Sequence, residues 1–144
     1  SAAASVVYYS QFQIGADGIA STAEEFSAIS AELSSGNGLD AVIITADTPS
    51  SEPLSIAARV ARDRAVVVAV GAVGTSVPRR LFYDKELDFR ISRSYGPGRY
   101  DPSYEEKGQD YPIGYVRWTE NRNMQAFIGL LSERKLSLGS LVTH

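Results

Sequence analysis

Apolar residues in the first half of the chain follow two patterns, and each predicts a different element. A capping box from Thr22 to Glu25 precedes apolar residues at helical spacing, and glycines within 36–38 follow them. The apolar stripe of this predicted helix consists of Phe26, Ile29 and Leu33. The next segment, Asp40–Ala46, has an uninterrupted apolar centre, which is typical of a parallel strand buried on both faces.

A second helix and a second buried strand follow after short links. Ser50, Ser51 and Pro53 predict the helix start, because proline is tolerated in the first turn of a helix. Its inner face is predicted to consist of Leu54, Ala57, Ala58 and Ala61. A strand is predicted over Ala65–Val70, and it ends at Gly71–Gly74. Strand, helix and strand in this order predict a βαβ unit with a right-handed crossover.

The second half of the chain predicts an edge strand and a final helix. Leu87, Phe89 and Ile91 alternate with polar residues, which indicates a strand with one wetter face, at the edge of the sheet. A helix is predicted near the C-terminus, with Thr119 or Asn121 as its cap. Its apolar residues, at helical spacing, are Met124, Phe127, Ile128 and Leu131.

Length and composition fit one globular domain. The chain has 144 residues, of which 44% are hydrophobic and 22% charged, and no segment has the composition of a linker. Residues 1–14 are the least readable, although Val6 to Tyr9 fit a short strand. We therefore predict a single α/β domain over residues 1–144, with a mostly parallel sheet, a long aromatic loop and a C-terminal helix.

Charge and residue usage argue against several classes of function. A net charge of −3 provides no basic footprint for nucleic acid or for an anionic membrane. No apolar run approaches the ~20 residues of a membrane helix, and no signal peptide is recognisable, so we expect a cytoplasmic protein. Because the chain has no cysteine and one histidine, His144, we expect neither a metal site nor a Ser-His-Asp triad. Neither G-x-G-x-x-G nor a Walker A motif occurs.

An aromatic segment, residues 94–118, stands out from these regular patterns. It holds five of the eight tyrosines, the single tryptophan and three of the six prolines. Arg93, Arg99 and Arg117 lie among the aromatic residues and could bind a sugar phosphate. Alternatively, the arginines and tyrosines satisfy backbone groups of an ordered loop, with the tyrosines and Trp118 holding it to the final helix. Both interpretations stay open at the level of the sequence.

Candidate binding residues follow the predicted strands. In an open α/β sheet, ligands bind at the carboxyl ends of the strands. Thr45–Thr48, Gly71–Gly74 and Ser92–Tyr95 would occupy these positions. The glycines at 71 and 74 would allow the backbone to approach a ligand closely, although such a pair also fits a simple turn.

Longer sequence matches narrow the class. Residues 40–46, 51–53, 57–59 and 66–74 resemble the nucleotide-binding domain of medium-chain dehydrogenases/reductases, a partial Rossmann-like three-layer fold. Residues 82–87, SRSYGPGRYDPSYEEKG (92–108), DYPIGYVRWTENRNM (110–124) and the closing Leu141–His144 are similar to the zinc-type dehydrogenase half of bi-domain oxidoreductases. That half is followed in the family by a sugar-dehydrogenase-like module. The resemblance covers about residues 15 to 144, and its long second part is the specific one.

The resemblance implies where a cofactor, NAD or NADP, would bind. Thr45 and Ala46 would lie near the adenosine or its ribose, and Gly71, Ala72 and Val73 would face the nicotinamide. Ser92 and Arg93 would line the nicotinamide side. It also implies a homo-oligomer that pairs through the edge strand, Leu87 to Ile91.

Two parts of the family pattern are not found in this sequence. The glycine-rich fingerprint and the acidic ribose-binding residue lie on earlier Rossmann strands, and the catalytic domain lies outside the matched region. We therefore expect an oxidoreductase fragment of the alcohol, polyol or sugar dehydrogenase type that binds cofactor weakly or not at all and is inactive alone. Its partners would be the remainder of the dehydrogenase or a fused second module. The alternatives are a non-catalytic assembly module and sugar-nucleotide binding through Arg99 and Arg117.

Overall fold

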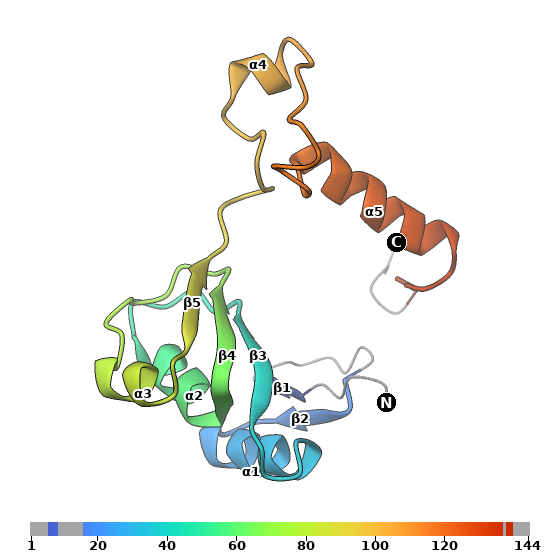
Figure 1. Cartoon of the computed structure of the whole chain (residues 1–144). Helices are drawn as coiled ribbons and strands as arrows, with labels where there is room; N and C mark the ends of the chain where they lie inside the picture. Colours follow the sequence, from blue (N-terminus) through green and yellow to red (C-terminus); the bar gives the residue numbers. More distant parts are fainter. Residues whose placement is uncertain (1–5, 9–15, 137, 140–144) are drawn as a thin grey trace. The chain divides into compact units, whose positions relative to one another are not determined.

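The computed structural model describes residues 6–8, 16–136, 138 and 139, and the chain divides into two compact units, residues 1–92 and 93–144. Figure 1 labels the elements of both units. One domain over residues 1–144 stays a prediction. Most of residues 1–14, and the closing Leu141–His144, lie outside the described residues.

The first unit is built on a parallel sheet of three strands. β3 (Leu39–Ile44), β4 (Ala61–Ala69) and β5 (Asp88–Ile91) lie in this order, and all neighbours are parallel. A separate two-stranded parallel sheet pairs β1 (Val6–Tyr8) with β2 (Gly18–Ala20). The α/β fold class and the edge position of the Leu87 to Ile91 segment are thus confirmed, and the short strand predicted at Val6 is present.

Local sequence signals explain the first two helices. α1 (Ala23–Leu33) begins after Thr22, whose side chain accepts a hydrogen bond from the Glu25 amide at 3.1 Å. α2 (Glu52–Val60) has proline in its first turn, and its predicted inner face is buried, with Leu54 at 0% exposure. α1 and α2 contact each other, and α2 contacts β3 and β4. The core of the unit therefore lies between the sheet and these helices.

The strand boundaries differ from the predicted ones at both β3 and β4. β3 ends at Ile44, so Thr45 and Ala46 lie beyond it. β4 begins at Ala61, directly after α2, where a shift of register separates the Leu39–Ala61 pair from the Ala41–Val66 pair. Arg64 adopts a φ of 59° within the extra residues, a conformation that the apolar pattern did not indicate.

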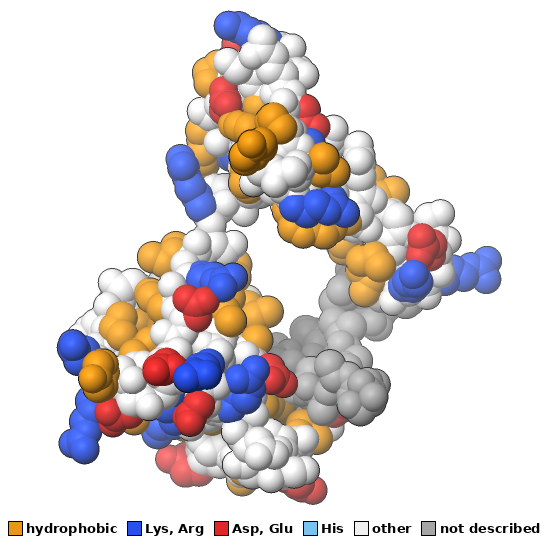
Figure 2. Space-filling model, viewed as in Figure 1, with side chains coloured by type: hydrophobic (Ala, Val, Ile, Leu, Met, Phe, Trp, Pro, Cys, Tyr) orange, Lys and Arg blue, Asp and Glu red, His pale blue; other side chains and the backbone are white. Residues whose placement is uncertain are grey.

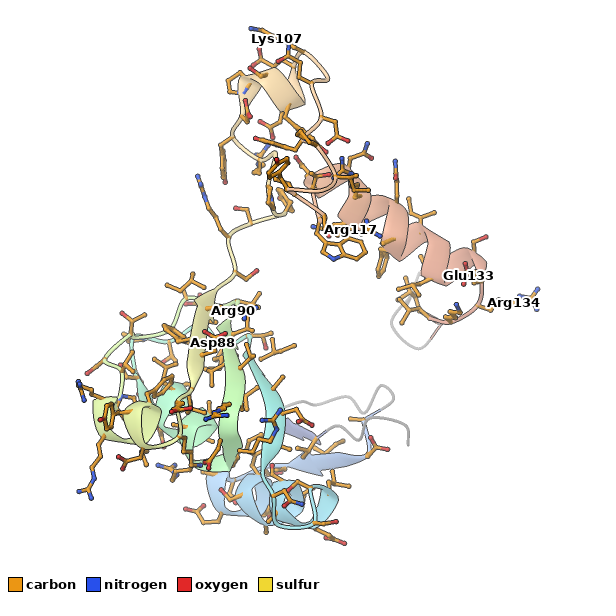
Figure 3. All side chains as sticks on the ribbon, viewed as in Figure 1. Asp88, Arg90, Lys107, Arg117, Glu133 and Arg134 are labelled. Atoms are coloured by element: carbon orange, nitrogen blue, oxygen red, sulfur yellow. The ribbon has the colours of Figure 1, made fainter. Side chains whose placement is uncertain are left out.

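Burial of β3 and β4 on both faces was predicted, and it is found on one face only. Ala65, Val67 and Ala69 of β4 are buried, whereas the alternate Val66 and Val68 are half-buried and Ile43 of β3 is 65% exposed. α2, which contacts β3 and β4, lies behind the sheet in Figure 1, and exposed hydrophobic side chains are visible on the near side of this unit in Figure 2. Asp88 and Arg90 lie side by side at its border and form an ion pair at 2.6 Å (Figure 3).

α3 (Arg79–Asp84) connects β4 to β5 and was not predicted from the sequence. Its N-cap is Pro78, and no side chain caps it. Phe82 is buried and meets Phe89 of β5 edge-on, with ring centroids 6.1 Å apart. Packing against the sheet therefore stabilises a short helix whose own start signals are weak.

The second unit consists of the aromatic segment and the final helix. α4 (Pro102–Glu105) is capped by Asp101, whose carboxylate accepts from the Ser103 amide at 2.9 Å, and α5 (Glu120–Ser132) is capped by Thr119. Thr119 rather than Asn121 is thus the cap. The apolar stripe of α5 is largely exposed, and the exposed fraction of Ile128 is 63%. No described helix of either unit is long and apolar enough to cross a membrane, and a cytoplasmic location stays a prediction.

Candidate functional site

The predicted cofactor residues of the first unit lie at the carboxyl ends of the strands. Thr45 and Ala46 follow β3, Gly71–Val73 follow β4, and Ser92 follows β5. Ser92 extends the pairing of β5 with β4 by one hydrogen bond, since its amide donates to the Ala69 carbonyl at 2.8 Å. We call the segment pair Thr45–Ala46 and Gly71–Val73 the carboxyl rim.

Gly71 is the point of closest approach within the carboxyl rim. A Cβ at Gly71 would lie 2.1 Å from the Ala46 carbonyl oxygen and 2.6 Å from that of Thr45. The Gly71 amide donates to the Ile44 carbonyl at 3.1 Å. The glycine predicted to admit a ligand is therefore required by the protein backbone itself, which brings the two rim segments into contact.

Beyond the rim, the two connecting segments stay paired. Thr48 and Val73 form a parallel bridge, with the Thr48 amide donating to the Ala72 carbonyl at 2.8 Å. Gly74 lies so close to the other segment that a Cβ would meet the Pro49 carbonyl oxygen at 2.3 Å. The Ser51 hydroxyl accepts from the Ser76 amide at 3.0 Å. These contacts give the rim a fixed backbone shape.

The helix that starts near the rim is poorly suited to hold a diphosphate. α2 follows β3, and the N-terminus of a helix usually attracts anions. Here the Glu52 amide already donates to the Ser50 hydroxyl at 3.1 Å, and the Glu52 carboxylate lies in the first turn. The negative charge of this carboxylate opposes the binding of a diphosphate at the start of α2. The residues of the carboxyl rim are themselves uncharged, so the rim does not form a phosphate cradle.

Arg93, the last of the predicted cofactor residues, belongs to the second unit. Its guanidinium lies over the ring of Tyr100, 5.1 Å from the centroid. Arg99 lies over the same ring at 4.6 Å, and Arg117 lies over Trp118 at 4.5 Å. The candidates Arg99 and Arg117 therefore share no ring, and Figure 3 marks Arg117 before α5.

Tyr104 ties the aromatic segment to the start of α5. Its hydroxyl donates to the Thr119 hydroxyl and accepts from the Asn121 amide, both at 3.1 Å. Its ring packs on Tyr111, with centroids 5.6 Å apart, and fills the space beside Gly98. Tyrosines thus hold the loop to the final helix as predicted, whereas Trp118 is 50% exposed.

Arg122 of α5 makes a second connection that the sequence did not reveal. Its guanidinium donates to the Val116 carbonyl, to the Tyr111 carbonyl at 2.7 Å and to the Asp110 carboxylate at 2.6 Å. The side chain is 15% exposed. One fork of donors therefore holds both ends of the segment 110–116 to α5.

A tyrosine–carboxylate pair gives the second unit a specific dependence on pH. The Tyr111 hydroxyl donates to Asp101, which lowers the pKa of Asp101 below its ordinary 3.8 and raises the pKa of Tyr111 above 10.0. Ionised Asp101 therefore contributes stability that is lost as pH falls through its folded pKa, below 3.8. Protonated Tyr111 contributes stability that is lost as pH rises through its folded pKa, above 10.0.

We expect Tyr111→Phe to destabilise the second unit at neutral pH, because the substitution removes the donor of this bond. The difference in stability between the two proteins should shrink toward zero at both pH extremes. Urea unfolding followed by Trp118 fluorescence at several pH values measures it. A difference that stays constant across the range would show that the pair contributes nothing specific.

The opposite end of the sheet carries a depression that no sequence motif predicted. It has a volume of about 510 Å³ and is lined in part by Gly38, Arg59, Arg62 and Lys85. The Lys85 ammonium donates to three carbonyls at the end of α2, among them Ala61 at 2.7 Å and Ala58 at 2.8 Å. The Lys85 charge is thus already used to cap a helix, and Arg62 pairs with Asp40 at 2.6 Å. Across the described ranges, no group of three or more acidic or histidine side chains could hold a metal ion.

Comparisons with known proteins identify the fold of this chain. No family model and no curated protein matches the sequence. Three solved structures each match 85% of this chain: the CurK enoyl reductase (TM-score 0.53, 14% identity), the nucleotide-binding subdomain of the enoylreductase domain of PpsC from Mycobacterium tuberculosis (0.50, 14%) and a structure assigned as an NADPH:quinone reductase from Bacillus thuringiensis (0.52, 16%). The chain shares its fold with these reductase domains.

The match covers part of each reductase. This chain spans 32% of the CurK structure, 61% of the PpsC subdomain and 33% of the quinone reductase. The partial Rossmann-like fold expected from the sequence is confirmed, whereas the zinc-type and sugar-dehydrogenase features are part of the proposal below.

Proposed function

We propose that this chain is part of the nucleotide-binding domain of an NAD(P)-dependent oxidoreductase and that the cofactor lies along the carboxyl rim. The observation that carries the proposal is the position of the rim. It lies where two adjacent parallel strands, β3 and β4, end, in a fold shared with reductase domains. Ligands of open α/β sheets bind at this edge.

The residues of the rim suit a cofactor ring better than its phosphates. Ala46 and Ala72 are exposed and uncharged, and Val73 is half-buried, so together they offer apolar surface to a planar ring. Glu52 opposes a diphosphate at the start of α2. Since most affinity for a dinucleotide comes from its phosphates, we expect millimolar or weaker binding by this chain.

Binding at the rim is tested by titrating NADH and NADPH while amide signals are recorded by NMR. We expect shifts at residues 45–46 and 71–73, and we expect Ala72→Glu to abolish them because it adds bulk and charge at an exposed rim position. Ala31→Glu, an exposed position on α1, is the matched control and should leave them unchanged. Equal losses in both variants, or shifts confined to other residues, would contradict the proposal.

We further propose that the parent enzyme is of the alcohol, polyol or sugar dehydrogenase type, as the zinc-type half of a bi-domain oxidoreductase. Residues 92–108 and 110–124 support this assignment through their resemblance to that family. Hydride transfer also needs a substrate held against the cofactor, and the proposed partner for this is the remainder of the dehydrogenase or a fused module. Oxidation of an alcohol or sugar by this chain alone, with NAD or NADP, would contradict the proposal.

Self-association through β5 is a second candidate function. β5 ends the sheet order, and within the described residues it pairs with β4 alone. Because the Ser92 amide points to β4, the preceding Ile91 amide points outward, where a partner strand would bind it. Ile91→Pro removes this donor and should convert a dimer to a monomer in light scattering. A dilute wild-type monomer would exclude this assembly.

A further inference from the structure

We propose that the second unit carries a site for a phosphate group, formed by Arg93, Arg99 and Tyr100. The ligand class is an organic phosphate, such as a sugar phosphate or a nucleotide. The proposal rests on contacts within the second unit and does not depend on the carboxyl rim.

Two guanidinium groups converge on one tyrosine. The Arg93 and Arg99 guanidinium carbons lie 5.1 and 4.6 Å from the centroid of the Tyr100 ring. Both positive charges therefore lie close to Tyr100, and an anion bound beside this ring would be attracted by both. Arginine is also the side chain that best matches the oxygens of a phosphate, through paired N–H donors.

Acidic partners do not neutralise both arginines. Glu105 pairs with Arg99 at 2.5 Å, whereas no carboxylate of the described residues pairs with Arg93. The Arg99 Nε–H is buried and has no acceptor in the part of the chain that the structure describes. The cluster therefore keeps one uncompensated positive charge and unused donors.

The backbone is strained at the two residues that complete the cluster. Ser94 and Tyr100 have φ values of 45° and 67°, in the left-handed region that non-glycine residues seldom adopt. These conformations bring their hydroxyl oxygens to 3.3 Å from each other. Strained positions persist where the surrounding structure fixes them, and they gather at binding sites. Hydrogen bonds from Ser94 and Arg99 also lower the pKa of Tyr100.

Exposed aromatic surface beside the arginines suits the organic part of such a ligand. Tyr95 is 63% exposed and Tyr100 58%, and Arg99 also lies over the Tyr95 ring at 5.4 Å. A sugar or a base can stack on these rings while its phosphate contacts the guanidinium groups. The geometry thus favours a phosphate ester over a free inorganic anion.

The proposal is tested by calorimetry on the full chain with inorganic phosphate, glucose 1-phosphate, AMP and adenosine. We expect a phosphate ester to bind and Arg93→Ala to weaken it about tenfold or more, as for loss of charge-assisted hydrogen bonds. Arg93 is the informative position, because it contacts the Tyr100 ring and its removal leaves Glu105 paired with Arg99. Arg79→Ala is the matched control, since Arg79 lies singly over an exposed tyrosine, Tyr83, at 5.2 Å.

A second readout separates this site from general charge effects. A phosphate bound beside Tyr100 should raise the pKa of its hydroxyl, and NMR of tyrosine labelled at Cζ measures that shift. Equal weakening by Arg79→Ala and Arg93→Ala, or equal binding of AMP and adenosine, would overturn the proposal. So would binding that Arg93→Ala leaves intact. Stronger binding of glucose 1-phosphate or of AMP would identify which source of phosphate the site takes.

Discussion

Replacing Gly71 by alanine is expected to unfold or strongly destabilise the first unit, by about 3 kcal/mol or more. The new Cβ would lie 2.1 Å from the Ala46 carbonyl oxygen and 2.7 Å from the Thr45 carbonyl carbon. Both are backbone atoms just beyond the end of β3, so no side-chain rotation relieves the contact. The substitution must instead separate the two segments of the carboxyl rim, which breaks the hydrogen bond from the Gly71 amide to Ile44.

Urea unfolding followed through amide signals of β3 and β4 measures this loss. Gly129→Ala is the control, because a Cβ at this position within α5 meets no atom within 4 Å. This control should leave the signals of the first unit unchanged, while α5 gains about 0.8–1 kcal/mol because alanine is favoured over glycine inside a helix. A Gly71→Ala protein as stable as the wild type would show that the rim segments separate freely. If Gly71→Ala retained the amide shifts induced by NADH or NADPH, cofactor binding would not depend on the close contact between the two rim segments.

Elements with strong local signals were predictable from the sequence. Thr22 and Thr119 cap their helices, and the short apolar runs of β3 and β4 predicted a parallel α/β unit. The fold could be assigned because these signals depend on neighbours along the chain. By contrast, α3 depends on Phe82 packing against β5, and the early start of β4 depends on a left-handed residue at Arg64. Neither leaves a periodic pattern.

The candidate sites also contain features that the sequence predicts and features that it does not. Thr45, Gly71 and Ser92 lie near one another because parallel strands have their carboxyl ends on the same side of a sheet. The convergence of Arg93 and Arg99 on Tyr100 does not follow, because left-handed conformations at Ser94 and Tyr100 set it. Asp101-Pro102 did carry a signal for α4, since aspartate is a common N-cap and proline a common first helical residue.

Arg122→Ala is expected to destabilise the second unit by about 3 kcal/mol, which would be the largest effect of any single side chain there. The substitution leaves the Val116 and Tyr111 carbonyls and the Asp110 carboxylate without their common donor. Arg122→Lys should recover part of this loss at most, because one ammonium cannot reach three acceptors in a fork geometry. Unfolding followed by Trp118 fluorescence gives the free energy, and limited proteolysis shows whether residues 110–118 open first.

Arg117→Ala separates the loss of this fork from the loss of a positive charge. Arg117 is exposed and lies over Trp118, and no carboxylate of the described residues pairs with it. Its removal should therefore change stability by no more than about 0.5 kcal/mol. If both alanine variants unfolded alike, net charge rather than the fork would hold the segment. If Arg122→Ala alone exposed residues 110–118 to protease, the order of the aromatic segment would depend on a helix residue that follows it in the sequence, and the segment would need α5 in order to fold.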